Sequence, residues 1–193
     1  MESMMSLKPL IIIALAGFIS GCANTTHNVA IEPSLTLQTA LLTNTHQINV
    51  TTDSLVAQKI GSIDTAINEH ADIVISNQLE ESVNIKVIQG LESLGFNLQQ
   101  GKTPASHLGV SITQLVYQTE TKGLKTVATM NFTLKANLKT ANKNYKASYS
   151  SEIVDEFATL PSQTEIEKRL NEVAGKTVTR LLNDSNIRLL LQE

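Results

Sequence analysis

Aromatic residues are scarce in this 193-residue sequence: Trp is absent, and Phe, Tyr and Trp together make up only 4% of the chain. Proteins that bind sugars or single-stranded nucleic acids commonly stack their ligands on aromatic side chains, so this class of function is disfavoured. Positive charge is also limited, because 15 Lys and Arg residues stand against 18 Asp and Glu, for a net charge of −3. Without a basic excess to neutralise phosphates, no nucleic-acid partner is expected.

Long apolar runs and paired cysteines are missing as well. The apolar stretch at residues 10–19 holds ten apolar or small residues, about half of the roughly 20 that a helix needs to cross a bilayer. The single cysteine, Cys22, cannot form an internal disulfide, so the fold must be stabilised by packing. A chain of this length with 41% hydrophobic residues suits one domain with a substantial core.

The N terminus has the pattern of a lipoprotein signal. Lys8 precedes the apolar run, and the run ends in "ISGC", residues 19–22. This segment resembles the lipobox of bacterial lipoproteins, in which an aliphatic residue and two small residues precede a cysteine. The cysteine is needed because its thiol is a nucleophile that can take diacylglycerol as a thioether. We therefore predict a cleaved signal peptide at residues 1–21 and attachment of lipid, including palmitate, at Cys22; two or three acyl chains anchor far more firmly than one.

The residues after the cysteine indicate a destination and a tether. In similar lipoproteins of Gram-negative bacteria an Asp at the next position tends to retain the protein in the inner membrane, whereas this chain has Ala23. The resemblance implies a protein anchored by lipid in the outer membrane and facing the periplasm. Residues 22–45 are rich in Thr and Asn without a steady period, which is typical of a tether. Apolar residues such as Val29 and Ile31 alternate in part, so some of this segment is expected to dock on the domain.

Residues 46–193 carry the periodicities of a single periplasmic domain. Apolar residues recur every three or four positions from Leu79 to Leu94, which predicts a helix that begins near Asn77, with Glu80 as a cap partner, and ends at Gly95. A second helix is predicted after Ser162 and Glu165, which form a capping box. Its apolar face consists of Ile166, Leu170, Val173, Thr177 and Leu181. The polar residues 183–186 should end this helix, and a short final turn or helix should follow.

Three long strands are expected between the two helices. Apolar residues occupy every second place over residues 128–138, and the same alternation resumes from Tyr145 to Phe157, which predicts a long hairpin. Upstream, the apolar parity changes between Ile112 and Leu115, which predicts a third strand with a bulge. The expected fold class is α+β: an antiparallel or mixed sheet with two main helices packed on one face, preceded by the signal peptide and tether.

Three segments resemble those of a known family. The lipobox, "NYKASY" at residues 144–149 and "NDSNIRLLLQE" at residues 183–193 together resemble the YajG-like lipoproteins of Gammaproteobacteria. Members of that family are outer-membrane or uncharacterised lipoproteins. The resemblance therefore implies a location in the cell envelope and brings no catalytic residues.

Motifs of enzymes and metal sites are not found. The four histidines do not stand at metal-ligand spacings from other ligand residues. They are His27, His46, His70 and His107. The densest polar cluster, Glu69, His70 and Asp72, precedes a strand-like segment and is interpreted as a loop. Since no G-x-S-x-G or S-x-x-K motif is present to activate a serine, we expect neither catalysis nor a cofactor nor a metal.

Two functions remain open. The first is a non-enzymatic binding module that uses an exposed face or edge of the sheet to hold an envelope protein or peptidoglycan. Four lysines on the polar side and tip of the hairpin could meet anionic headgroups or peptidoglycan carboxylates, or could simply favour solubility. They are Lys135, Lys139, Lys143 and Lys146.

The second function is a lipid carrier. It would need a pocket for an acyl chain lined by Met130, Phe132 or Tyr149, and a closed, well-packed core would count against it. The three tyrosines, Tyr117, Tyr145 and Tyr149, share the apolar parity of the strands, which favours a packing role over ligand stacking.

Overall fold

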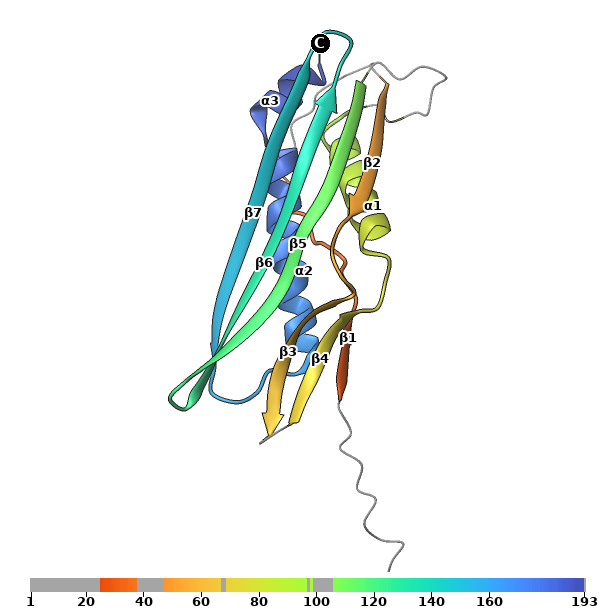
Figure 1. The fold of residues 1–193 in the computed structure, drawn as a ribbon. Helices are drawn as coiled ribbons and strands as arrows, with labels where there is room; N and C mark the ends of the chain where they lie inside the picture. Colours follow the sequence, from red (N-terminus) through yellow and green to blue (C-terminus); the bar gives the residue numbers. More distant parts are fainter. Residues whose placement is uncertain (1–24, 38–46, 67–68, 97, 99–105, 193) are drawn as a thin grey trace, which may run out of the picture.

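A computed structural model describes residues 25–37, 47–66, 69–96, 98 and 106–192. The elements in chain order are β1 (Thr26–Val29), β2 (Ile48–Ser54), β3 (Lys59–Ala66), β4 (Glu69–Ile75), α1 (Leu79–Ser93), β5 (Ser106–Lys122), β6 (Lys125–Lys139), β7 (Asn144–Phe157), α2 (Gln163–Leu182) and α3 (Ser185–Leu190). They form one mixed seven-stranded sheet with the helices on one face (Figure 1). The predicted α+β class is confirmed. The predicted signal peptide and Cys22 lie outside the described residues.

The sheet is built around the antiparallel meander β5–β6–β7. The strand order is β1-β4-β3-β5-β6-β7, and β2 lies beside the first half of β5. β3 takes over the same edge of β5 further along, where Gly61 pairs with Tyr117. The predicted hairpin is confirmed by the continuous β6–β7 register, and the predicted bulge by a shift in the β5–β6 register between Ile112 and Gln114. The bulge keeps Leu115 and Tyr117 on the buried side after the parity change.

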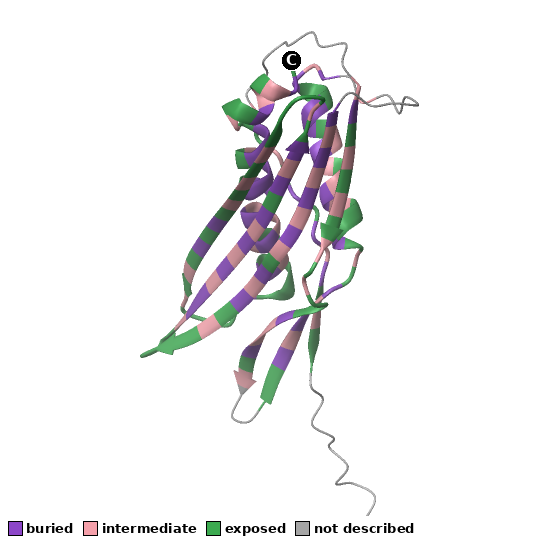
Figure 2. Cartoon of the chain, turned by 45° about the horizontal axis from the view of Figure 1, so that its top comes forward, coloured by how far each residue is buried: buried purple, intermediate pink, exposed green. Residues whose placement is uncertain are grey.

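Burial alternates along these strands, as a period of two requires (Figure 2). In β6 the side chains from Ala128 to Leu138 with even numbers are all buried, and those between them are exposed or half-buried. The buried set packs under α1 and α2. The other side of the sheet, which we call the open face, is covered by no helix in the described part of the chain (Figure 1) and is mostly polar.

The helices begin and end largely as their sequences dictate. Ser162 and Glu165 form the predicted capping box at the start of α2, and Gly95, with φ 89°, ends α1. The cap predicted at Asn77 is wrong, because Gln78 holds that position and gives no side-chain cap. The Asn77 amide instead accepts from the Ile31 N–H at 2.9 Å and donates to the Ile31 carbonyl at 3.0 Å.

Residues 25–37, which the sequence assigns to the tether, form part of the folded unit. β1 extends the sheet by pairing in parallel with β4, and Val29 and Ile31 are completely buried. Residues 30–37, which we call the strap, then run along α2. The folded unit therefore begins before residue 46, where the domain boundary was predicted. Residues 25–37 dock on the domain far more extensively than the partial alternation of their apolar residues indicated.

The strap and α2 match residue by residue. Along α2 every fourth residue meets every second residue of the extended segment. The pairs are Asn28 with Gln163, Ala30 with Glu167, Glu32 with Asn171, Ser34 with Gly175, and Thr36 with Thr179. Four helical residues rise about 6 Å and two extended residues about 6.6 Å, so the two repeats stay nearly in step. The strap does not pair with a described strand. Its backbone N–H and C=O groups form hydrogen bonds with side chains of α2 instead.

The long sheet gives the molecule two distinct ends. β1 and β4 are parallel and both start at one end of the sheet. β3 is antiparallel to β4 and parallel to β5, so β3 and β5 both finish at this same end. We call this the β1 end; it holds the β5–β6 turn at Gly123 and Leu124 (Figure 1). The opposite end holds the β6–β7 turn and α3. β6 spans most of this length, about 46 Å for 15 residues.

Candidate functional site

A groove of about 640 Å³ lies on the open face, in the half nearest the opposite end. β2, β5, β6 and β7 each contribute side chains to it. We call it the open-face groove, and its lining includes Thr51, Asp53, His107, Gly109, Ser111, Lys135, Asn137, Lys146 and Ser148. These residues come together because each lies on the outward parity of its strand, in adjoining register positions.

The floor of the groove is hollow at Gly109. A Cβ placed there would meet only ordinary contacts, the nearest being the Asn137 carbonyl oxygen at 3.7 Å. The hollow therefore results from the missing side chain and not from backbone strain. Gly is uncommon inside a strand, and where it occurs it often allows a ligand or another backbone to approach closely. This is the one signal in the sequence that could have located the groove.

Charge in the groove is predominantly positive. Lys135 and Lys146 are exposed on neighbouring strands, with Asp53 on β2 across the groove. The side-chain oxygen Oδ1 of Asn137 is enclosed and has no hydrogen-bond partner among the described residues. An enclosed acceptor without a donor costs free energy, so this oxygen makes the lining of the groove locally less stable than a fully bonded strand.

The predicted lysines divide between groove and tip. Lys135 and Lys146 line the groove, while Lys139 lies further along β6 on the same outward parity. Lys143 is exposed in the β6–β7 turn, beside the start of β7. The structure thus gathers these cations on the half of the open face that lies away from the β1 end.

The histidines are spread over separate strands. His27 is in β1 and His70 in β4, while His46 lies outside the described residues. His107 is in the groove, where its Nε2 lies 3.3 Å from the Thr51 hydroxyl. No carboxylate contacts the other ring nitrogen of His107 within the described ranges, so this pair lacks the third member that orients a catalytic base.

The interpretation of residues 69–72 as a loop is wrong. Glu69, His70 and Asp72 belong to β4, which pairs with both β1 and β3. Asp72 forms an ion pair with Lys59 at 2.7 Å, so its carboxylate already has a partner within the sheet. Within the part of the chain that the structure describes, no group of three His, Cys, Asp or Glu side chains could hold a metal ion.

The residues named for an acyl-chain pocket lie in a packed core. Met130 and Phe132 are both 0% exposed under α2, and the Thr177 hydroxyl of α2 donates to the Phe132 carbonyl at 3.3 Å. Tyr149 is half-buried, with its hydroxyl on Asp184. The closed core counts against a lipid carrier.

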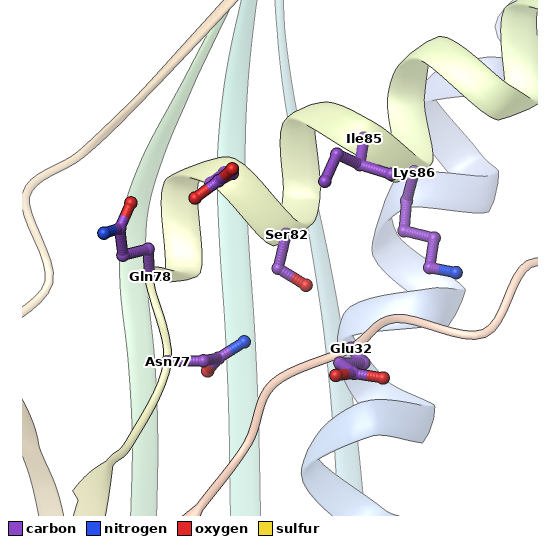
Figure 3. A pocket seen from close by; sticks show the side chains of 7 residues that line it. Glu32, Asn77, Gln78, Ser82, Ile85 and Lys86 are labelled. Atoms are coloured by element: carbon purple, nitrogen blue, oxygen red, sulfur yellow. The ribbon is translucent and has the colours of Figure 1, made fainter.

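A second hollow, of about 400 Å³, lies between the strap and α1 (Figure 3). Ser82 is at its centre, with Glu32 on the strap and Lys86 on the helix. Asn77 also lines this hollow, but both ends of its amide are already bonded to the strap. Within the described residues no hydrogen bond joins the Ser82 hydroxyl to the lysine or the carboxylates that line this hollow, so nothing here activates it as a nucleophile.

The two segments that carry the family resemblance meet in space. The hydroxyls of Tyr145 and Tyr149 both donate to Oδ2 of Asp184, the former at 3.0 Å. The other oxygen of Asp184 caps α3 by accepting from the N–H groups of Asn186 and Ile187. We call this set the Tyr–Asp cluster. It fastens the C-terminal helix to β7, so these segments have a clear structural role.

The electrostatics of the Tyr–Asp cluster follow from these bonds. Partial burial alone would raise the pKa of the Asp184 carboxyl, but the hydrogen bonds from Tyr149, from the Asn186 amide and from Tyr145 outweigh it and hold the pKa below its usual value. Burial, together with the adjacent carboxylate, raises the pKa of the Tyr149 hydroxyl. The cluster therefore keeps a charged Asp184 beside a neutral Tyr149 hydroxyl at neutral pH.

With this geometry in place, comparison with known sequences identifies the family. A family described as uncharacterized lipoprotein matches the chain over residues 33–192. The chain belongs to this YajG-like lipoprotein family. The match includes the strap from Pro33, the open-face groove and the Tyr–Asp cluster. No curated protein matches the chain.

Solved structures share the fold at very low sequence identity. Protein XCC0632 from Xanthomonas campestris, of the DUF330 family, has a TM-score of 0.56 at 8% identity, over 87% of this chain and 95% of its own. An uncharacterized protein has a TM-score of 0.48 at 11% identity, over 81% and 98%. A neuraminyllactose-binding hemagglutinin homologue from Helicobacter pylori has a TM-score of 0.41 at 12% identity, over 82% and 97%. At such identities the first similarity supports the fold alone.

Among the described residues, neither α1, α2 nor α3 is both long enough and apolar enough to span a membrane.

Proposed function

We propose that this family member is held by lipid on Cys22 in the outer membrane, faces the periplasm, and serves there as a non-enzymatic binding module. Membership in a lipoprotein family supports the envelope location. The segment "ISGC" supports the attachment site, and Ala23 supports the outer membrane as destination. The lack of serine-activating motifs in the sequence and the incomplete Thr51–His107 pair support a role without catalysis.

The observation that carries the proposal is the open-face groove. Both main helices and the strap pack on the other side of the sheet, so the groove is formed by strands that nothing covers in the described part of the chain (Figures 1 and 2). Its floor is free at Gly109 and its rim carries Lys135 and Lys146. A partner that presents carboxylates to the rim fits this chemistry. Such groups occur on peptidoglycan stem peptides and on acidic segments of envelope proteins.

A lipid carrier is the weaker alternative. It requires an apolar cavity within the fold, and the residues that would line it, Met130 and Phe132, are packed against α2 without exposure. The open-face groove does not suit this role, because it is an open surface hollow whose lining includes the charged side chains of Asp53, Lys135 and Lys146, which an acyl chain would have to desolvate.

The test is photocrosslinking in cells from the groove rim. A photoreactive side chain at Ser148, which is exposed in the groove, should trap one or a few envelope proteins or cell-wall fragments, and the identity of the product distinguishes these two partners. Gly109→Val should abolish the product, because a Cβ at this position meets only ordinary contacts and a valine side chain, which suits a strand, would fill the floor.

Charge and stability controls accompany this experiment. Lys135→Glu combined with Lys146→Glu should reduce crosslinking, whereas Lys168→Glu, an exposed position of α2 on the helix side, should not. Both groups of variants should melt like the parent protein. Undiminished crosslinking in Gly109→Val would contradict the proposed site, and stoichiometric lipid in an extract of the protein would favour the carrier instead.

A further inference from the structure

The β1 end carries a large apolar side chain at its outermost point. Leu124 is 98% exposed and lies with Gly123 in the two-residue turn between β5 and β6, where Lys122 pairs with Lys125. Gly123 has a φ of 66°, which the first central position of a tight hairpin turn requires. The second position usually carries Gly, Asn or another polar residue, so the turn itself does not call for a leucine.

The charges behind Leu124 are arranged in layers. Lys122 and Lys125 flank the turn, and the carboxylates that neutralise them lie further from the tip: Glu120 at 3.2 Å from Lys122 and Glu156 at 2.8 Å from Lys125. From the tip inward the order is therefore apolar, cationic and acidic. A lipid leaflet presents acyl chains, then phosphates, then water, and this order complements the tip.

The chain leaves little distance between the proposed anchor and this tip. Cys22 precedes the start of β1 at Thr26 by four residues, and an extended chain covers at most about 3.6 Å per residue, or about 14 Å here. β1 is fixed to β4, and the strap that follows it is fixed to α2. The lipid therefore holds the β1 end close to the membrane surface.

We propose that Leu124 inserts into the leaflet that holds the acyl chains of Cys22, so that the β5–β6 turn is a second, non-covalent membrane contact. This inference rests on the lipid anchor of the proposed function. Two contacts fix an orientation where one would not: the long strands point away from the bilayer, and the open-face groove is held toward the periplasmic interior.

The test uses the full-length lipoprotein in vesicles. Since the lipid consumes the thiol of Cys22, Leu124→Cys provides the only free thiol of the mature protein. An environment-sensitive fluorophore on this thiol, in vesicles of phosphatidylethanolamine and phosphatidylglycerol, should emit at shorter wavelength than in buffer and lose intensity when spin-labelled lipid is added. The matched control is Asn142→Cys in the β6–β7 turn, which is also exposed and should behave as in water.

Each other outcome has a defined meaning. If the protein floats with the vesicles but the label at position 124 is no more quenched than the label at 142, the inference is overturned and the anchor stands. Quenching at both positions would also overturn it, because the domain would then lie flat on the surface. A protein that does not float refutes the anchor itself, and the inference with it.

Discussion

Phe132 and Thr133 are neighbours in β6 that face opposite sides of the sheet. Phe132→Asp would place an unpaired charge in the fully buried layer and should lower the free energy of unfolding by at least about 3 kcal/mol. Thr133 lies on the open face, where its hydroxyl bonds that of Ser150 at 2.9 Å, and Thr133→Asp should cost less than about 1 kcal/mol. Urea unfolding of the fragment from Ala23 onward measures both. Equal losses would contradict the assignment of the two faces.

Asp184 makes stability depend on pH in a definite direction. Its pKa is lower in the folded protein than in the unfolded chain, so its contribution is fully present above about pH 4 and is lost as the pH falls through the folded pKa. Asp184→Asn keeps an oxygen that can cap α3 but replaces the charged acceptor of the two tyrosine hydroxyls by a neutral one, so it should cost about 1 kcal/mol at pH 7 and less at pH 3. Urea unfolding of both proteins at several pH values tests this.

Tyr149→Phe provides a related variant. It removes one hydrogen bond to the Asp184 carboxylate but leaves the cap on α3, so it should weaken the pH dependence without removing it. If Asp184→Asn were equally destabilising at pH 7 and pH 3, the charged form of this carboxyl would not be the form that the fold stabilises.

Two helical glycines differ in how much a methyl group at their position would cost. Replacing Gly by Ala inside a helix normally stabilises it by about 1 kcal/mol. At Gly175 the new Cβ would collide with the backbone carbonyl of Ser34 in the strap, whereas at Gly90 it would meet only the flexible end of Leu182. Gly175→Ala should therefore displace the strap and lower stability, and Gly90→Ala should cost much less.

Hydrogen exchange measures this prediction directly. In Gly175→Ala the amides of Ala30 and Glu32, which are bonded to side chains of α2, should exchange faster, while amides of β6 keep their protection. Unchanged exchange of these amides in Gly175→Ala would show that the strap does not depend on close approach at this glycine.

The elements that the sequence predicted are those with local signals. The capping box at Ser162, the glycine stop at Gly95 and the parity change at the β5 bulge each involve residues close in the chain. The strap was underestimated because its partners are distant. The side chains that hold it, such as Glu167 and Asn171, look like the solvated face of an amphipathic helix, and only the tertiary fold shows that their four-residue spacing matches an extended segment.

The open-face groove also combines features that local sequence patterns predict with contacts between distant segments that they do not. The outward parity of Lys135 and Lys146 could be predicted from alternation along the hairpin. Their meeting with Asp53 and Gly109 depends on the parallel pairing of β2 with β5. Pairing between strands so far apart in sequence leaves no periodic trace in either strand, so apart from the glycine at 109 the sequence carried no signal for the groove.

For the whole molecule, anchoring and sorting are the properties that variants can test first. Labelled palmitate should enter the protein through Cys22, and Cys22→Ser should abolish both the labelling and cleavage after Gly21, because no other side chain offers the thiol. Membrane fractionation of labelled cells measures this. A Ser variant that still carried labelled lipid would contradict the attachment site.

The destination has a separate variant. Ala23→Asp should shift the protein toward inner-membrane fractions, since an Asp after the lipidated cysteine favours retention there in similar lipoproteins. An unchanged density profile would remove the support that Ala23 gives to the outer membrane.

The strap also decides how the domain would carry mechanical load. If the lipid holds the start of β1 and a partner in the open-face groove pulls toward the opposite end, the force runs along β1 and the strap, parallel to β4 and α2. The hydrogen bonds along this path then lie across the direction of pull and must yield together, in shear, whereas a perpendicular pull would open them one by one. The segment that reads as a slack tether in the sequence would thus be a strong link between membrane and partner.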